Sequence, residues 1–137
     1  MEINNSSVLI TGGSSGIGKE TAKQFIAKGA KVVITGRDEN KLKKIAHEIG
    51  AIPLVFDISD LKSIVQKAKD ALSLLEGKID TLVNNAGIGA FPLLGEITEN
   101  DLLSVYNTNV FGMALLTQEL LPKFKEQSSG NIINIGG

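Results

Sequence analysis

The sequence predicts an α/β fold in which a doubly wound parallel sheet carries helices on both faces. Short β-branched apolar runs alternate along the chain with longer segments whose apolar residues recur every three to four positions. Glycine and polar residues follow the apolar runs, at the strand ends where a parallel sheet gathers its loops. Right-handed crossovers then favour the strand order 3-2-1-4-5, in a single domain over residues 1–137.

The first unit of this pattern is a strand followed by a helix. Residues 7–11 form an apolar run that stops at Gly12, and a helix is expected over 16–28, with Gly29 as its end. A second strand is expected over 31–35. The residues expected on the buried face of the helix are Ile17, Ala22, Phe25 and Ile26.

Signals at the ends of the next two helices place them in the chain. A helix over 39–49 is expected to begin after Asp38 and to end at Gly50, and a strand over 52–56 follows it. Asp60 is the expected N-cap of the third helix. The apolar positions of that helix are Leu61, Ile64, Val65, Ala68, Leu72 and Leu75.

The last part of the chain carries a long helix between two strands, expected over 79–84 and 131–135. Thr98 and Asp101 have the spacing of a capping box and mark the start of the helix, which Pro122 is expected to kink or end late. The stripe expected to face the sheet consists of Leu103, Tyr106, Val110, Ala114, Thr117, Leu121 and Phe124.

The composition restricts the classes of function. With 42% hydrophobic and 21% charged residues and a net charge of -1, the chain is typical of a globular protein and offers no nucleic-acid or anionic-membrane surface. The sequence has no cysteine, which excludes disulfides and thiolate metal sites and fits a cytoplasmic location. No membrane-spanning run, secretory signal or metal-ligand spacing is recognisable.

The stretch 8–18, VLITGGSSGIG, predicts a dinucleotide site. It has the pattern of a strand, a glycine-rich turn and a helix N-terminus, where the first backbone N–H groups have no partner within the helix. Gly12, Gly16 and Gly18 leave room for a diphosphate to approach the backbone, and the serines between them add hydroxyl donors. An ordinary tight turn is the alternative.

Arg37 follows the second strand, about 20 residues after the glycine turn, where the adenosine ribose is bound in such folds. A guanidinium binds a phosphate with two N–H donors, so the sequence favours NADP(H) over NAD(H). The alternative is a solvated Arg37. Asp38 either reaches the ribose or caps the second helix, and the preference of Asp for N-caps favours the cap.

Polar residues also follow the third and fourth strands. Asp57 either accepts a hydrogen bond from the adenine amino group or closes a turn on its own backbone. Asn84 and Asn85, with Ala86 and Gly87 after them, either line a ribose pocket and tie strand ends together or form an ordinary turn.

Four residues of the helices call for separate interpretation. Asn107 and Asn109 indicate either a local distortion of the long helix or an exposed polar face, because Asn competes for backbone groups. Tyr106, the only tyrosine, falls on the apolar stripe and is expected in the core. His47 is expected to be solvated or to act as a C-terminal helix cation, without a catalytic role.

Together these motifs resemble the N-terminal part of the short-chain dehydrogenases/reductases, over essentially the whole chain. The resemblance implies a Rossmann-like fold and an NAD(P)-dependent oxidoreductase that transfers a hydride between nicotinamide and a carbonyl or alcohol substrate. The matching segments are TGGSSGIG at 11–18, TGR at 35–37, DI at 57–58, NNAG at 84–87, NVFG at 109–112 and NIINI at 131–135.

The resemblance also implies roles for single residues. Arg37 matches the basic position of NADP-preferring members, and Asp57 matches the adenine contact. Asn109 matches the helix asparagine of the catalytic Asn-Ser-Tyr-Lys set, which distorts the helix and orders a water in a proton relay. The expected cofactor-binding residues are Gly12, Ser14, Ser15, Gly16, Ile17, Gly18, Arg37, Asp57, Ile58, Asn84, Ala86 and Gly87.

The sequence departs from the family's pattern at its C-terminal end. Gly137, by its position after Asn134, takes the slot of the catalytic serine, and the Tyr-x-x-x-Lys motif is absent, so the fold is expected to be truncated after its fifth strand. This predicts a chain that is inactive or impaired as given. The alternatives are a catalytically silent NADP(H)-binding module and a marginally stable fragment.

Members of the family are usually homodimers or homotetramers, and the resemblance therefore implies a homo-oligomer with no nucleic acid or membrane as partner. The unpaired edge of the final strand also predicts self-association. A second apolar set on the long helix, expected at a subunit interface, consists of Leu102, Val105, Leu116 and Leu120.

Overall fold

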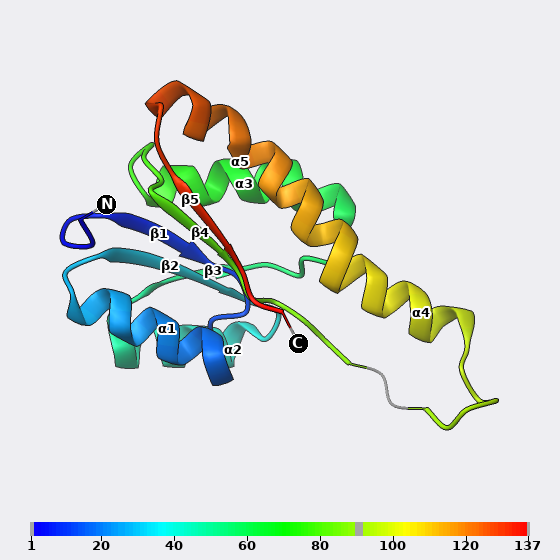
Figure 1. Cartoon of the computed structure of the whole chain (residues 1–137). Helices are drawn as coiled ribbons and strands as arrows, with labels where there is room; N and C mark the ends of the chain where they lie inside the picture. Colours follow the sequence, from blue (N-terminus) through cyan, green and yellow to red (C-terminus); the bar gives the residue numbers. More distant parts are fainter. Residues whose placement is uncertain (1, 90–91, 137) are drawn as a thin grey trace.

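A five-stranded parallel sheet with the strand order β3-β2-β1-β4-β5 forms the centre of the molecule (Figure 1), which confirms the predicted fold class and topology. This computed structural model describes residues 2–89 and 92–136. The strands are β1 (Ser7–Ile10), β2 (Lys31–Gly36), β3 (Ile52–Val55), β4 (Thr81–Asn84) and β5 (Asn131–Asn134). The helices are α1 (Gly16–Ala27), α2 (Glu39–Ile49), the 3-10 turn η1 (Leu61–Ser63), α3 (Ile64–Leu74), α4 (Glu99–Tyr106), the π-helical segment η2 (Asn107–Gly112) and α5 (Met113–Gln127).

β1 lies in the middle of the sheet and divides the core into two layers. Its four residues are all buried. Val8 packs with Ala22 in the cluster under α1 and α2, whereas Leu9 joins Ile64 of α3 and Leu120 of α5 on the opposite face. Side chains alternate between the two faces of a strand, so β1 contributes to both layers. In Figure 1, α1 and α2 lie below the sheet and α3 and α5 above it.

The cap of α2 is as predicted, and that of the third helix is not. Asp38 accepts a hydrogen bond from the Lys41 backbone N–H (3.1 Å), and Gly50 ends α2 in the left-handed conformation (φ 82°). The Asp60 side chain makes no capping bond, so the predicted N-cap is wrong. Its carbonyl oxygen accepts from the Ser63 backbone N–H (3.0 Å) instead, and this bond closes the 3-10 turn ahead of α3.

Two residues predicted to face the core lie at the surface. Ile17 is 62% exposed and Val65 is 48% exposed. Ile17 lines a groove on the outer side of α1 together with Ile3 and Phe25. The prediction failed here because the apolar stripes of these helices extend beyond the area that the sheet covers.

The long helix is made of three consecutive segments. Thr98 and Asp101 form the predicted capping box at the start of α4, and the π-helical η2 separates α4 from α5. α5 continues through Pro122 and ends at Gln127. A π-helical turn contains an additional residue, so it shifts the phase of any apolar stripe that crosses it.

The predicted inward stripe of this helix is therefore wrong for most of its members. Leu103, Tyr106 and Val110 are exposed, and of the whole stripe only Phe124 is buried. Both faces of the helix carry apolar residues, so the apolar period alone does not decide which face meets the sheet. The residues that are buried are Thr108, Gly112, Leu116, Leu120 and Phe124.

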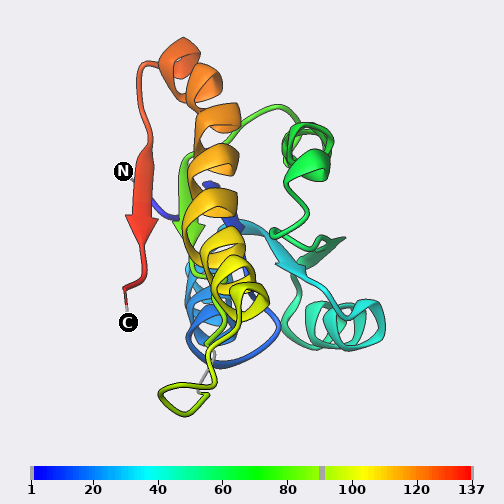
Figure 2. The same ribbon diagram turned by 90° about the vertical axis from the view of Figure 1, so that its right-hand side faces the viewer.

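β5 forms an edge of the sheet, as Figure 2 shows. Among the strands that the structure describes it pairs with β4 alone, and every residue of β5 is exposed, including Ile132 and Ile133. An edge strand of this kind can pair with a further strand.

Candidate functional site

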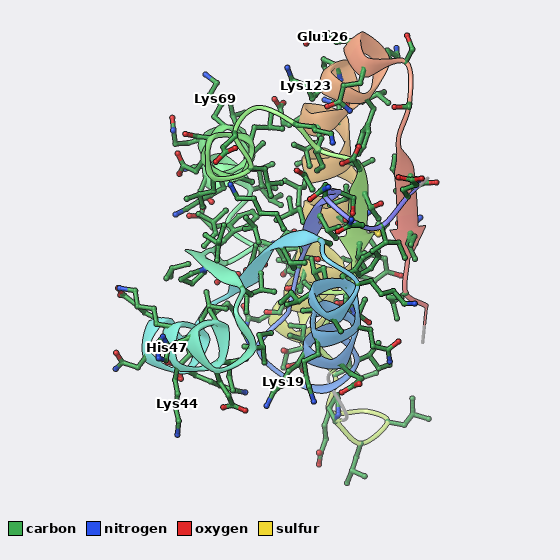
Figure 3. All side chains as sticks on the ribbon, turned by 90° about the vertical axis from the view of Figure 1, so that its left-hand side faces the viewer. Lys19, Lys44, His47, Lys69, Lys123 and Glu126 are labelled. Carbon is green, nitrogen blue, oxygen red and sulfur yellow. The ribbon has the colours of Figure 1, made fainter. Side chains whose placement is uncertain are left out.

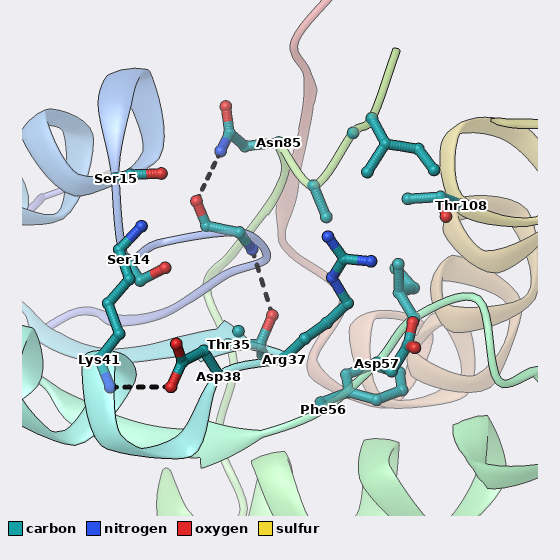
Figure 4. A pocket seen from close by; sticks show the side chains of 16 residues that line it. Ser14, Ser15, Thr35, Arg37, Asp38, Lys41, Phe56, Asp57, Asn85 and Thr108 are labelled. Carbon is teal, nitrogen blue, oxygen red and sulfur yellow. Dashed lines mark hydrogen bonds between the residues drawn. The ribbon is translucent and has the colours of Figure 1, made fainter. Parts of the chain in front are cut away.

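A cavity of about 610 Å³ lies at the carboxyl ends of the strands, beside the point where the strand order reverses between β1 and β4. Figure 4 shows the side chains that line it. This is the place where open parallel sheets bind their ligands, and the volume is that of a small-molecule site. The lining residues are Gly12, Ser14, Ser15, Thr35, Gly36, Arg37, Asp38, Lys41, Phe56, Asp57, Ile58, Asn85, Ala86, Gly87, Ile88 and Thr108.

The glycines of the first turn permit two close approaches of the backbone. Gly12 has φ +65°, and a Cβ atom there would lie 2.8 Å from the Ala86 Cα atom. A Cβ atom on Gly18 would overlap the Gly12 carbonyl oxygen and the Asn85 side-chain amide. Any larger residue at these two positions would push the glycine turn away from the end of β4.

The first turn of α1 presents free backbone donors. The first hydrogen bond of the helix runs from the Lys19 N–H to the Ser15 carbonyl oxygen (3.2 Å), and the Ser15 side chain does not cap it. The N–H groups of Gly16, Ile17 and Gly18 make no hydrogen bond to any residue that the structure describes. Free N–H groups and the helix dipole together favour an anion at this end of α1.

The N–H of Gly12 is not one of these donors, because it is bound to the Thr35 hydroxyl (3.2 Å). Gly13 likewise donates its N–H to the Thr35 carbonyl oxygen (2.9 Å). Gly12 therefore serves the site by its lack of a side chain. Thr35 fixes the start of the glycine turn against β2, a role that sequence reasoning did not assign.

Thr11 and Asn85 join the ends of β1 and β4. The Thr11 hydroxyl oxygen accepts hydrogen bonds from the backbone N–H groups of Asn85 (3.1 Å) and Ala86 (3.0 Å). The Asn85 side chain donates to the Gly12 carbonyl oxygen (2.9 Å) in return. These bonds confirm that the NNAG segment ties neighbouring strand ends together.

Asn84 is placed differently from its neighbours. It is buried, does not line the cavity, and donates through Nδ2 to the Thr117 hydroxyl (3.1 Å) and to Asn134 Oδ1 (2.9 Å). Its Oδ1 atom is buried and has no hydrogen-bond partner in the part of the chain described. Asn84 thus joins β4 to α5 and β5, and its expected part in cofactor binding is not visible in its contacts.

Asp57 closes a turn on the neighbouring backbone, which is one of the two roles that the sequence predicts for it. Its Oδ1 atom accepts from the backbone N–H (3.0 Å) and the hydroxyl (2.6 Å) of Ser59. The residue also lines the cavity, together with the buried Ile58. An adenine contact by Asp57 stays a prediction.

The distortion predicted around Asn107 and Asn109 is the π-helical segment η2. Asn109 accepts from the Ile88 N–H (2.8 Å) and donates to the Ile88 carbonyl oxygen (2.7 Å), so its side chain fixes the backbone that leaves β4. Gly112 closes the segment against Ile58, whose carbonyl oxygen occupies the place of a Cβ atom. Thr108, which no motif singled out, projects from this segment into the cavity wall (Figure 4).

Arg37 and Lys41 bring two cations to the cavity. Arg37 follows β2 directly, and Lys41 lies in the first turn of α2. Figure 4 shows the guanidinium of Arg37 in the middle of the site and the Lys41 side chain beside Ser14. From the sequence, Asp38 was expected either to cap the helix or to reach the ribose. The structure shows that it caps α2.

The remaining candidates lie away from the cavity. His47 is exposed on the outer side of α2 (Figure 3), and Tyr106 is 52% exposed, which contradicts its predicted core position. Gly137 lies outside the described residues. Within 2–89 and 92–136 there is no group of three or more His, Cys, Asp or Glu side chains that could hold a metal ion, and no helix long and apolar enough to cross a bilayer.

Comparisons with known proteins bear on this geometry. A family model described as short chain dehydrogenase matches residues 6–137. An NADP-dependent 3-hydroxy acid dehydrogenase of Schizosaccharomyces pombe is 38% identical over 144 residues, which cover 98% of this chain and 54% of that protein. Dehydrogenase/reductase SDR family member 7B of Xenopus laevis is 37% identical, over 93% of this chain and 43% of that protein.

Solved structures give the same result. A metagenomic short-chain oxidoreductase in complex with NADP superimposes with a TM-score of 0.92 at 31% identity, over 100% of this chain and 64% of that one. A 3-ketoacyl-(acyl-carrier-protein) reductase from Brucella melitensis complexed with NADH gives 0.91 at 37% identity, over 98% and 58%. The chain thus spans about half the length of the relatives that it matches.

Proposed function

This chain belongs to the short-chain dehydrogenase/reductase family, and we propose that it binds NADP(H) in preference to NAD(H) as the cofactor-binding part of an oxidoreductase. When bound, such a cofactor supplies a hydride or accepts one at its nicotinamide. The residues of this chain bind and orient it. The substrate would be a carbonyl compound or the corresponding alcohol, as the family resemblance implies.

The observation that carries this proposal is the first turn of α1. Three consecutive N–H groups, of Gly16, Ile17 and Gly18, are without partners in the described structure, and they follow Ser15 on the wall of the cavity. Unsatisfied amides at a helix N-terminus are a favourable site for a diphosphate. A Cβ atom on Gly16 would meet no heavy atom within 4 Å, so the space beside this turn is open.

The preference for NADP(H) depends on the end of β2. Arg37 lines the cavity, and the Asp38 carboxylate beside it is engaged as the N-cap of α2. A guanidinium favours a 2′-phosphate on the adenosine ribose, and a carboxylate free to reach the ribose would favour the unphosphorylated cofactor. Of the proteins compared, the Schizosaccharomyces pombe dehydrogenase is NADP-dependent and the metagenomic oxidoreductase is in complex with NADP, whereas the Brucella reductase is complexed with NADH.

The polypeptide of residues 1–137 is proposed to bind the cofactor but to turn over slowly or not at all by itself. Of the family's Asn-Ser-Tyr-Lys set it holds Asn109, while Gly137 stands at the serine position and the Tyr-x-x-x-Lys motif is absent from this sequence. A catalytically silent NADP(H)-binding module is the second candidate, and no tyrosine is among the described residues that line the cavity.

We also propose a homo-oligomer in the cytoplasm. The segments α4, η2 and α5 present a surface with several exposed apolar side chains, as subunit interfaces do, and the absence of cysteine fits a reducing compartment. The exposed residues of this surface are Leu102, Leu103, Tyr106, Val110, Phe111, Leu115 and Leu121.

Fluorescence titration with NADPH and NADH tests the proposal. We expect saturable binding of NADPH with a dissociation constant below the millimolar range and weaker binding of NADH. A carbonyl substrate added to the complex should cause little or no oxidation of NADPH. If neither cofactor binds below a millimolar concentration, the proposed function is wrong.

A further inference from the structure

Lys41 is a second cation at the cavity, to which no motif of the sequence gave a role. It lies four residues after Arg37, in the first turn of α2, and both side chains line the same cavity. Figure 4 shows them approaching the site from two directions, with Lys41 extended along the wall that carries Ser14. The charge of the site therefore depends on two cations.

Neither cation is engaged by a carboxylate within residues 2–89 and 92–136. Lys43, on the same helix, forms an ion pair with Glu39 (2.6 Å). Arg37 and Lys41 have no ion pair and no side-chain hydrogen bond with any residue that the structure describes. Two unpaired cations beside one cavity leave their donors available to a bound anion.

Carboxylates on the cavity wall offset the positive charge of Arg37, so the charge of Lys41 matters for the site. The Asp38 carboxylate lines the cavity, as does that of Asp57, so Arg37 alone would leave one more carboxylate than cation on the cavity wall. A phosphate monoester carries between one and two negative charges at neutral pH, by analogy with about −1.5 to −2 for phosphorylated side chains. Lys41 balances the second carboxylate and adds a cationic donor for such a group.

The N-cap of α2 also determines where Lys41 lies. The Asp38 carboxylate accepts from the Lys41 backbone N–H (3.1 Å), which fixes the first turn of α2 relative to the end of β2. Gly36 keeps the space beside it open, since a Cβ atom there would lie 3.4 Å from the Ser14 hydroxyl and 3.3 Å from Leu42. The hydroxyl of Ser14 is thus a third polar group in this corner of the cavity.

We propose that Lys41 is a second ligand of the cofactor's 2′-phosphate and, with Arg37, determines the selectivity for NADP(H). The inference rests on the proposed NADP(H) binding and adds a residue that selects between the two cofactors. Lys41 then acts only on the phosphorylated form, because NAD(H) carries a hydroxyl at the 2′ position.

The test compares Lys41→Gln with a matched control, Lys44→Gln, in fluorescence titrations of the whole chain with NADPH and NADH. Lys44 carries the same charge on the same helix, is exposed, and lies outside the cavity; Figure 3 shows it extending away from the molecule. Gln at position 41 keeps the backbone N–H that Asp38 caps, and helix content by circular dichroism verifies that each variant is folded.

We expect Lys41→Gln to raise the dissociation constant of NADPH about tenfold, the loss of one charge-assisted contact, and to leave that of NADH unchanged. Lys44→Gln should change neither. If Lys41→Gln behaves like Lys44→Gln while the wild-type chain binds NADPH, the role of Lys41 is wrong and the proposed function stands. An equal loss for both cofactors also refutes the role. A wild-type chain that binds neither cofactor refutes the proposed function itself.

Discussion

Arg37 is the single residue on which the proposed choice of cofactor depends most. Arg37→Asp should raise the dissociation constant of NADPH about tenfold or more, because it replaces the guanidinium on the cavity wall with a second carboxylate beside Asp38. The dissociation constant of NADH should stay the same or fall. Titration of the variant with both cofactors measures the ratio, and an unchanged ratio would refute the assignment of NADP(H).

Asn109 is predicted to act through the backbone that leaves β4. Asn109→Ala removes the two hydrogen bonds to Ile88 and should lower the free energy of unfolding by about 1–3 kcal/mol, because it leaves a backbone donor and a backbone acceptor unpaired. Urea denaturation measures the change. Asn107→Ala is the matched control in the same π-helical segment, since its side chain makes no hydrogen bond within the described residues. Equal losses in the two variants would contradict the role of Asn109.

Half of the sixteen residues that line the cavity were among the expected cofactor-binding residues, but the groups that hold the site in place were not. Arg37, Asp57, Ala86 and the glycine turn were expected and do line the site or adjoin it. Thr35 was missed because its function is a tertiary contact between β2 and the glycine turn, which no local pattern records. Lys41 was missed because a lysine in an amphipathic helix resembles any solvated one.

At the scale of elements, the capping box of α4 makes that helix sensitive to pH. The Thr98 backbone N–H donates a hydrogen bond to the Asp101 carboxylate (2.9 Å). This bond first, and the interaction with the Thr98 side chain second, hold the pKa of the Asp101 carboxyl below its usual value. A lowered pKa in the folded state means that the stabilisation is complete above the unfolded value of about 3.9 and is lost as the pH falls through the folded value. Cα chemical shifts of α4 should therefore move toward coil values below that pH.

Thr98→Ala provides the comparison for this prediction. It should weaken the start of α4 by about 1 kcal/mol at neutral pH and reduce the acid transition of the helix. Asn100→Ala, at an exposed position of the same turn, should leave the transition unchanged. Because α4 has no buried residue, the effect should be confined to that helix. Part of the acid transition should remain, because the variant keeps the Thr98 backbone N–H that donates to Asp101; a transition as large as that of the wild-type chain would contradict the role of the box.

The elements with clear end signals were predicted well, and the long helix was not. The bounds of α2 agree with its cap at Asp38 and its stop at Gly50, since both signals are local and have a physical effect on the backbone. The orientation of α4, η2 and α5 failed because the π-helical segment shifts the stripe and because apolar residues lie on both sides. When both faces of a helix carry apolar residues, the position of the sheet determines which face is buried.

At the scale of the whole molecule, the parallel order of the strands creates the site. The turns after four strands meet beside the reversal between β1 and β4, and each contributes side chains to one cavity. The alternation of strands and helices along the sequence was sufficient to predict this meeting point, because right-handed crossovers leave few other arrangements. It was not sufficient to predict which helical face stays exposed.

That exposed face and the edge of β5 predict self-association of the chain. Leu102, Leu103 and Phe111 are among the apolar side chains left on the surface of α4 and η2, and β5 is an edge strand that pairs with β4 alone among the described strands. Sedimentation velocity at micromolar concentration should show a dimer or larger species. Leu103→Glu should shift the distribution toward the monomer, whereas Lys44→Glu should not. A wild-type chain that sediments as a monomer would contradict the prediction.

A crystal structure of the chain with NADPH tests the central claim most directly. We expect the diphosphate within hydrogen-bonding distance of the free N–H groups in the first turn of α1, and the 2′-phosphate beside Arg37. A cofactor whose diphosphate lies elsewhere, with those N–H groups still without a partner, would contradict the account.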